Sequence, residues 1–137
     1  MFAEFEKIIH NMAESGQPLT CESMSSVYRD LNIWYYGKGM HVDEEISMEW
    51  MRIPHFYRTF YVYKYSTGFC AAAALASQIL QEGKPAVERY LRFLSSGGSD
   101  YPINLLKKAG VDMTSTDPVN TALKSFSKMI GQLDELL

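Results

Sequence analysis

The sequence is poor in cysteine, has little net charge and contains no long apolar run. Its 137 residues include two cysteines, Cys21 and Cys70, and both fall within helical patterns, so buried free thiols are favoured over a disulfide framework. The net charge is -3 and the 13 lysines and arginines are scattered, which argues against a surface that follows nucleic-acid phosphates. The longest run of low charge, residues 66–80, is too short and too rich in small residues to span a bilayer. We therefore expect a cytoplasmic protein that binds neither nucleic acid nor membranes.

The sequence also lacks a complete catalytic apparatus. Its histidines are His10, His41 and His55, and no two of them have the i, i+4 spacing with which a His-Glu-x-x-His helix binds zinc. A Gly-x-Ser-x-Gly elbow, a phosphate-binding glycine loop and a Cys-x-x-Cys pair are absent as well. The adjacent acids at 43–45 suit the positive end of a helix dipole better than a metal ion. No metal ligands are therefore predicted within this chain.

Apolar residues at helical spacing are present along most of the chain. They recur every three or four positions, and in the last segment they are expected to place four side chains inward: Ala122, Phe126, Ile130 and Leu133. Thr20 can cap the second segment through its hydroxyl. The expected helices cover residues 1–15, 20–36, 43–50, 55–81, 85–94, 101–109 and 117–137. We therefore predict an all-α fold with about six or seven helices, in a single domain over residues 1–137.

The stretch from 55 to 81 is open to two interpretations. Tyr61, Tyr63 and Tyr65 alternate as in a β-strand, and aromatic residues favour strands. The continuation CAAAALASQILQEG has the alanine content of a strong helix former and ends at a glycine. This continuation favours one long helix, on which Tyr61 and Tyr65 lie one turn apart and point the same way.

Three segments of the chain resemble a known family. MFAEFEKIIH, IPHFYRTFYVYKYSTGF and GGSDYPINLLKKAGVDM, in this order and at this separation, resemble the C-terminal portion of the oligoendopeptidase F family of zinc metallopeptidases, in the thimet oligopeptidase-like clan. The resemblance implies a helical catalytic domain with a deep channel for short, unfolded peptides, and a zinc ion held by a His-Glu-x-x-His helix and a downstream glutamate. In that family the zinc-binding stretch precedes the segment that resembles residues 1–10. We therefore expect a fragment or a truncated product that does not hydrolyse peptides alone.

The resemblance also implies roles for residues 53–65. His55 matches a channel histidine and Tyr61 matches the first of several tyrosines, and both would stabilise the developing oxyanion and bind the substrate backbone. A phenol donates a hydrogen bond at neutral pH without carrying charge, and such a donor can contribute roughly 3 kcal/mol in a site with little water. Further candidates for substrate binding are Tyr57, Tyr63 and Tyr65. Helical spacing cannot point all of them into one channel, so some must belong to the core.

Two alternatives remain open on the sequence alone. Residues 53–65 could be an apolar helix face, because buried tyrosines need only some hydrogen-bond partner. Arg58 and Lys64 are expected to be solvated or to snorkel rather than to clamp a substrate. The whole chain could also be a free-standing helical interaction module, since a half-domain would expose an apolar aromatic face and self-associate into a homo-oligomer.

Overall fold

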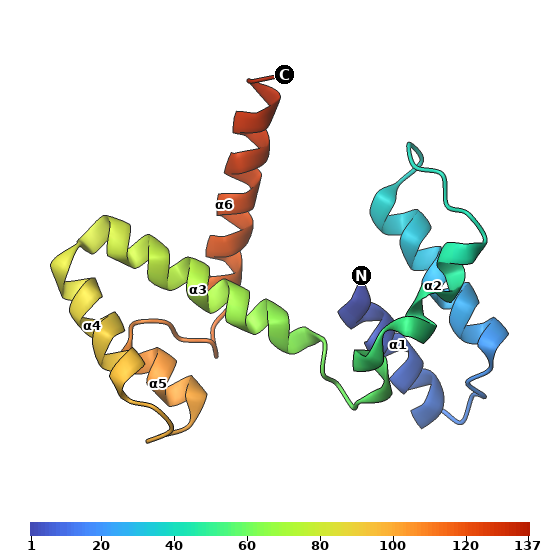
Figure 1. Ribbon diagram of the computed structural model, residues 1–137, viewed down its shortest axis with the longest axis horizontal. Coiled ribbons are helices and arrows are strands. Elements are labelled where there is room, and N and C mark those ends of the chain that lie inside the picture. The colour runs from blue at the N-terminus through green and yellow to red at the C-terminus, as the bar shows by residue number, and fades with distance from the viewer. The chain divides into compact units, whose positions relative to one another are not determined.

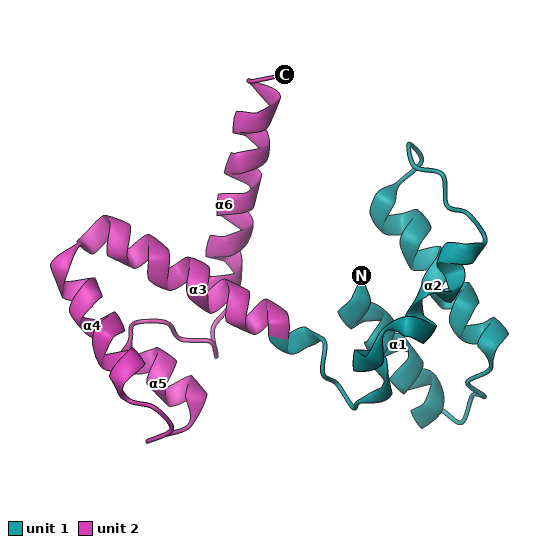
Figure 2. Ribbon diagram, viewed as in Figure 1, with its two compact units in different colours: residues 1–64 teal, residues 65–137 magenta.

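The chain folds entirely into helices. A computed structural model, which describes residues 1–137, contains six α-helices and two 3₁₀ segments and has no strand. The all-α prediction is therefore confirmed. The helices gather into two compact units, Met1–Lys64 and Tyr65–Leu137, which Figure 2 shows in different colours. The expectation of one domain over residues 1–137 stays a prediction.

Unit 1 holds two α-helices and both 3₁₀ segments. These four elements are α1 (Phe2–Glu14), α2 (Cys21–Tyr36), η1 (Glu45–Arg52) and η2 (Pro54–Tyr57), and Figure 1 labels the two α-helices. Thr20 caps α2 as expected: its hydroxyl accepts the Ser23 N–H at 3.1 Å, and the Ser23 hydroxyl accepts the Thr20 N–H at 3.0 Å. This reciprocal pair is a capping box, which fixes where α2 begins. The third expected helix forms at nearly the expected place, but as a 3₁₀ helix.

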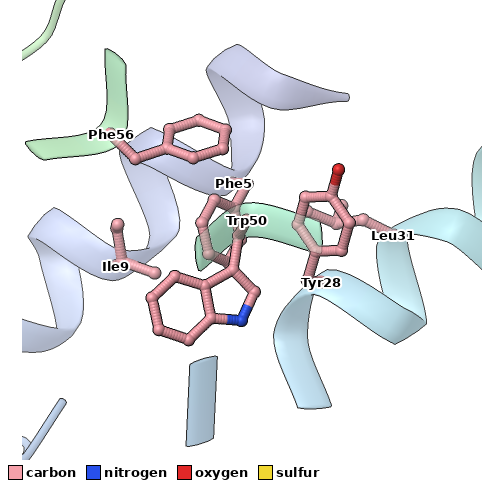
Figure 3. Packing of buried hydrophobic residues seen from close by; sticks show 6 residues of the cluster. All are labelled: Phe5, Ile9, Tyr28, Leu31, Trp50 and Phe56. Atoms are coloured by element: carbon pink, nitrogen blue, oxygen red, sulfur yellow. The ribbon is translucent and has the colours of Figure 1, made fainter. Parts of the chain in front are cut away.

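The core of unit 1 is built around the ring of Phe5, which is fully buried. Its centroid lies 4.9 Å from that of Phe56 and 5.1 Å from that of Tyr28, and both contacts are edge-to-face. Figure 3 shows the cluster converging between the helices; its members are Phe5, Ile9, Tyr28, Leu31, Trp50 and Phe56. The Tyr28 hydroxyl donates to Glu49 Oε2 at 2.8 Å. Burial, and then this bond, raise the pKa of Tyr28 well above its ordinary value.

Unit 2 holds the other four helices. They are α3 (Tyr63–Glu82, whose first two residues belong to unit 1), α4 (Lys84–Ser95), α5 (Pro102–Lys108) and α6 (Asp117–Asp134). Gly83 separates α3 from α4 at a φ of +66°, a left-handed conformation that suits glycine, and Figure 1 shows α4 turning back at this point. The buried core of this unit consists of Ala71, Ala74, Leu75, Ala109 and Val111.

The long helix begins at Tyr63 and not at His55, so that part of the prediction is wrong. Residues 54–57 form the 3₁₀ segment η2, and a turn follows in which Phe60 has a φ of +48°. A left-handed phenylalanine cannot continue a right-handed helix. Tyr61 therefore lies in the turn before α3. The expectation that Tyr61 and Tyr65 lie one turn apart on a single helix is wrong for the same reason.

The last helix is less buried than expected. Ala122 is buried, as predicted, but the side chains of Phe126, Ile130 and Leu133 are 58, 49 and 57 % exposed. Their expected inward position is wrong because the second half of α6 has no buried residue within its unit. No helix of the chain has the length and apolarity needed to cross a membrane. Both thiols are free, but only Cys70 is buried, whereas Cys21 is exposed, against expectation.

Candidate functional site

His55 and Tyr61, the two residues expected to be catalytic, lie side by side in unit 1. Their ring centroids are 5.3 Å apart with an angle of 31° between the ring planes. His55 comes from η2, and Tyr61 comes from the turn before α3. Both side chains are partly exposed, so both can meet a ligand. The sequence pattern predicted that both residues lie on one helix. In the structure, the turn with a positive φ at Phe60 brings them together.

Two cationic side chains lie against the Tyr61 ring. The Arg58 guanidinium carbon is 5.8 Å from the ring centroid, and the Lys64 ammonium nitrogen is 5.2 Å from it. At these distances a cation is attracted to the negative face of an aromatic ring. Both residues are exposed, as expected, but they also place positive charge beside the phenol. Negative charge that develops near Tyr61 is therefore favoured.

The backbone of this turn is held by Glu6, which sequence reasoning missed as a site residue. Glu6 lies in α1 and is 1 % exposed. Its Oε1 accepts the N–H of Tyr61 at 2.8 Å, and its Oε2 accepts the N–H of Val62 at 3.1 Å. The sequence does contain a pattern that indicates its burial. Glu6 is four residues after Phe2 and three before Ile9, which places it on the apolar face of the first helix. A carboxylate at such a position needs a buried partner.

The three further tyrosines do not surround His55 and Tyr61 as one group. Tyr57 is 70 % exposed, and its hydroxyl donates to the Met51 carbonyl at 2.9 Å. Tyr63 lines a shallow hollow of about 460 Å³ together with Phe60 and residues of α1. Tyr65 belongs to unit 2, where it lines an apolar groove of about 550 Å³ between α3 and α6. Their role in substrate binding stays a prediction.

A zinc ion does not fit the residues of this chain. Nowhere do three or more histidine, cysteine, aspartate or glutamate side chains gather closely enough to hold a metal ion. His10 is engaged instead in a local bond, because its Nδ1 lies 2.7 Å from the carbonyl oxygen of Glu6. The residues of the candidate site thus offer hydrogen-bond donors and positive charge.

The chain matches a protein family model and several known proteins. The family model described as peptidase family M3 matches residues 1–125. Oligopeptidase PepF of Bacillus subtilis (strain 168) is 58% identical over 137 residues, which are 100% of this chain and 20% of that protein. Group B oligopeptidase PepB of Streptococcus agalactiae serotype III (strain NEM316) is 45% identical over 136 residues, covering 99% of this chain and 23% of that protein.

Two further relatives agree with these. Oligoendopeptidase F, chromosomal, of Lactococcus lactis subsp. cremoris is 43% identical, with 99% of this chain and 23% of that protein covered. A crystal structure from Chlamydophila abortus matches with a TM-score of 0.86 and 46% identity, over 99% of this chain and 23% of that chain. The chain thus spans about a fifth of the length of the curated relatives it matches. Their names confirm the resemblance to the oligoendopeptidase F family.

Proposed function

This chain belongs to peptidase family M3, and we propose that it forms the substrate-channel portion of a zinc-dependent oligopeptidase. The observation that carries the proposal is the pairing of His55 and Tyr61, with ring centroids 5.3 Å apart. The names of the relatives support hydrolysis of peptides as the reaction of the whole protein. The family resemblance implies a deep channel, so the proposed substrates of the whole protein are short, unfolded peptides.

The chemistry of the pair suits peptide hydrolysis. When the peptide carbonyl is attacked, negative charge develops on its oxygen, and a donor fixed in advance stabilises that charge. The phenol of Tyr61 supplies such a donor, and an imidazole N–H of His55 supplies another to the oxyanion or to the substrate backbone. The charges of Arg58 and Lys64 beside the Tyr61 ring favour the same developing charge.

The zinc ion and its ligands would have to come from residues outside this chain, since no group within it fits a metal ion. Zinc would supply the activation of water in the whole protein. The residues described here bind and orient the peptide and stabilise charge. By themselves they lack a group that activates water, so we expect the isolated chain to be inactive.

A chimera tests this proposal. The chain replaces its 58% identical counterpart in the Bacillus subtilis relative, and the product is assayed with a quenched fluorogenic peptide. We expect turnover that a chelator abolishes, and no turnover when the isolated chain is incubated with zinc. A chimera that folds and binds zinc but does not cleave the peptide would contradict the proposal. Chelator-sensitive turnover by the isolated chain would contradict its second part.

A second candidate function is that of a self-associating interaction module, and the surface of α6 favours it. Five apolar side chains of this helix are between 49 and 60 % exposed: Leu123, Phe126, Met129, Ile130 and Leu133. A contiguous apolar face of this kind tends to be covered by another protein surface. Sedimentation velocity at several concentrations tests for self-association. A folded chain that stays monomeric at every concentration rules this function out.

A further inference from the structure

We infer that Glu6 is a positioning residue for Tyr61: its buried carboxylate fixes the backbone from which the Tyr61 side chain leaves. The inference rests on the proposed function for what Tyr61 does, but the link between Glu6 and Tyr61 stands on its own geometry. The two residues are 55 positions apart in the sequence and are joined at 2.8 Å.

The two acceptor atoms of Glu6 match two consecutive donors. Oε1 accepts from Tyr61 and Oε2 accepts from Val62, at 2.8 and 3.1 Å, so the carboxylate holds the two peptide units that flank the Cα of Tyr61. Hydrogen bonds to an ionised acceptor are stronger than those between neutral groups. Glu6 is 1 % exposed, and a buried carboxylate is stable only where donors satisfy it. The burial of Glu6 and the position of this turn therefore depend on each other.

Phe60, the residue before Tyr61, is also in contact with α1. Phe60 has a φ of +48°, which is unfavourable for a bulky residue and persists only where the surroundings impose it. The His10 ring lies against the Phe60 ring, with centroids 4.2 Å apart and 32° between the planes. His10 is one helical turn after Glu6, and its Nδ1 donates to the Glu6 carbonyl oxygen at 2.7 Å. Two residues of α1, one helical turn apart, thus hold Phe60 and the two residues that follow it.

The contacts of Glu6 and His10 with this turn also determine where the Tyr61 hydroxyl lies. The backbone at residue 61 sets the direction of the side chain, and the Tyr61 ring then lies beside the His55 ring at 5.3 Å. If the carboxylate is lost, the turn can relax toward the favoured φ of Phe60 and carry the phenol away. A displacement of about 1 Å can cost up to about 100-fold in rate when a group must meet a transition state.

The variant Glu6→Gln tests whether the Glu6 carboxylate holds the backbone N–H groups of Tyr61 and Val62. The amide has nearly the same shape but offers one acceptor oxygen, and its NH₂ group would face one of the two N–H donors. In hydrogen-exchange NMR of the 137-residue chain, we expect the Tyr61 and Val62 amides to exchange about tenfold faster or more in this variant. Glu14→Gln is the matched control, because Glu14 is an exposed residue of the same helix. Unchanged exchange of both amides in Glu6→Gln would overturn the inference.

A double-mutant cycle in the chimera tests whether Glu6 affects catalysis through Tyr61. We expect Glu6→Gln to lower kcat by up to about 100-fold with little change in KM, and to add nothing when Tyr61→Phe is already present. A full additional loss in the Tyr61→Phe background would overturn the inference, since Glu6 would then act by another route. If Tyr61→Phe alone leaves kcat unchanged, the proposed function fails, while faster amide exchange in Glu6→Gln still upholds the inference.

A measurement on the wild-type chain covers the case in which Glu6→Gln does not fold. Scalar couplings across hydrogen bonds join an amide nitrogen to the carbon of the accepting group. We expect such couplings from the Tyr61 and Val62 amides to Cδ of Glu6. Well-resolved signals of both amides without this coupling would overturn the inference.

Discussion

The carboxylate of Glu6 lies 2.8 Å from the backbone nitrogen of Tyr61, although the two residues are 55 positions apart in the sequence. This contact ties α1 to the turn before α3 and so fixes one half of the candidate site. Because the same turn brings Tyr61 to His55, the first helix of the chain shapes a site whose ring-bearing residues lie much later in the sequence. The candidate site therefore depends on the packing of unit 1.

Removal of the Phe5 ring is expected to destabilise unit 1. The side chain is fully buried and contacts the rings of Tyr28 and Phe56, so Phe5→Ala leaves a cavity that costs about 3–5 kcal/mol in free energy of unfolding. Urea unfolding followed by Trp50 fluorescence measures this cost, in a background where the exposed Trp34 is replaced by phenylalanine.

The same substitution at an exposed ring is the control. Phe126 is 58 % exposed, and Phe126→Ala should leave the unfolding transition reported by Trp50 unchanged. A cost below about 1 kcal/mol for Phe5→Ala would contradict the packing described for unit 1.

Alkaline pH is expected to weaken unit 1 through Tyr28. Burial and the bond to Glu49 raise the pKa of this phenol in the folded state above its ordinary value near 10. The folded state therefore binds the proton more tightly, so its extra stability is complete below about pH 10 and is lost as the pH rises above it. Urea unfolding at several pH values should show this decline in the wild type and a weaker one in Tyr28→Phe. Equal slopes for the two proteins would show that Tyr28 is not linked to unfolding.

Acid is expected to weaken unit 2 through two aspartates. The bond from Lys108, and then those from Asn104 and the Tyr101 N–H, lower the pKa of Asp100 to about 2. Asp112 also has its pKa lowered to about 2, chiefly by its bond from Lys107. Because both values lie below the unfolded value near 4, this stability is present above about pH 4 and is lost as the pH falls toward 2.

The double variant Asp100→Asn, Asp112→Asn measures this contribution. Thermal unfolding between pH 5 and pH 2, followed by far-UV circular dichroism, should show a flatter decline of the melting temperature in the variant than in the wild type. Asp134→Asn serves as the control, because Asp134 is exposed at the end of α6 and should leave the wild-type decline in place. Identical declines in the double variant and the wild type would count against these two bonds as a source of stability.

The sequence predicted those elements that carry local signals. The start of α2 at Thr20 and the end of α3 at Gly83 were both predicted. Both boundaries depend on residues only a few positions apart, as in the capping box of Thr20 with Ser23. The approximate extent of five of the six α-helices followed from hydrophobic spacing in the same way. The family motifs also pointed to the two rings that the structure brings together.

The turn at residues 58–62 could not be predicted from local patterns. Its helix-breaking feature is a positive φ at Phe60, and phenylalanine carries no preference for that conformation. Its hydrogen-bond partner, Glu6, comes from the first helix, and no rule based on spacing connects the two. Periodicity likewise showed that α6 has an apolar face but could not show whether anything covers it.

The kcat of the chimera that carries Tyr61→Phe tests directly whether the Tyr61 hydroxyl stabilises the oxyanion. The ring and its contact with His55 remain, and only the hydroxyl is lost, so we expect kcat to fall about 100-fold with a smaller change in KM. The control is Tyr36→Phe, which removes the hydroxyl of an exposed residue at the end of α2 and should leave kcat at the level of the unmutated chimera. An unchanged kcat in folded Tyr61→Phe would contradict the assignment of this site to oxyanion stabilisation.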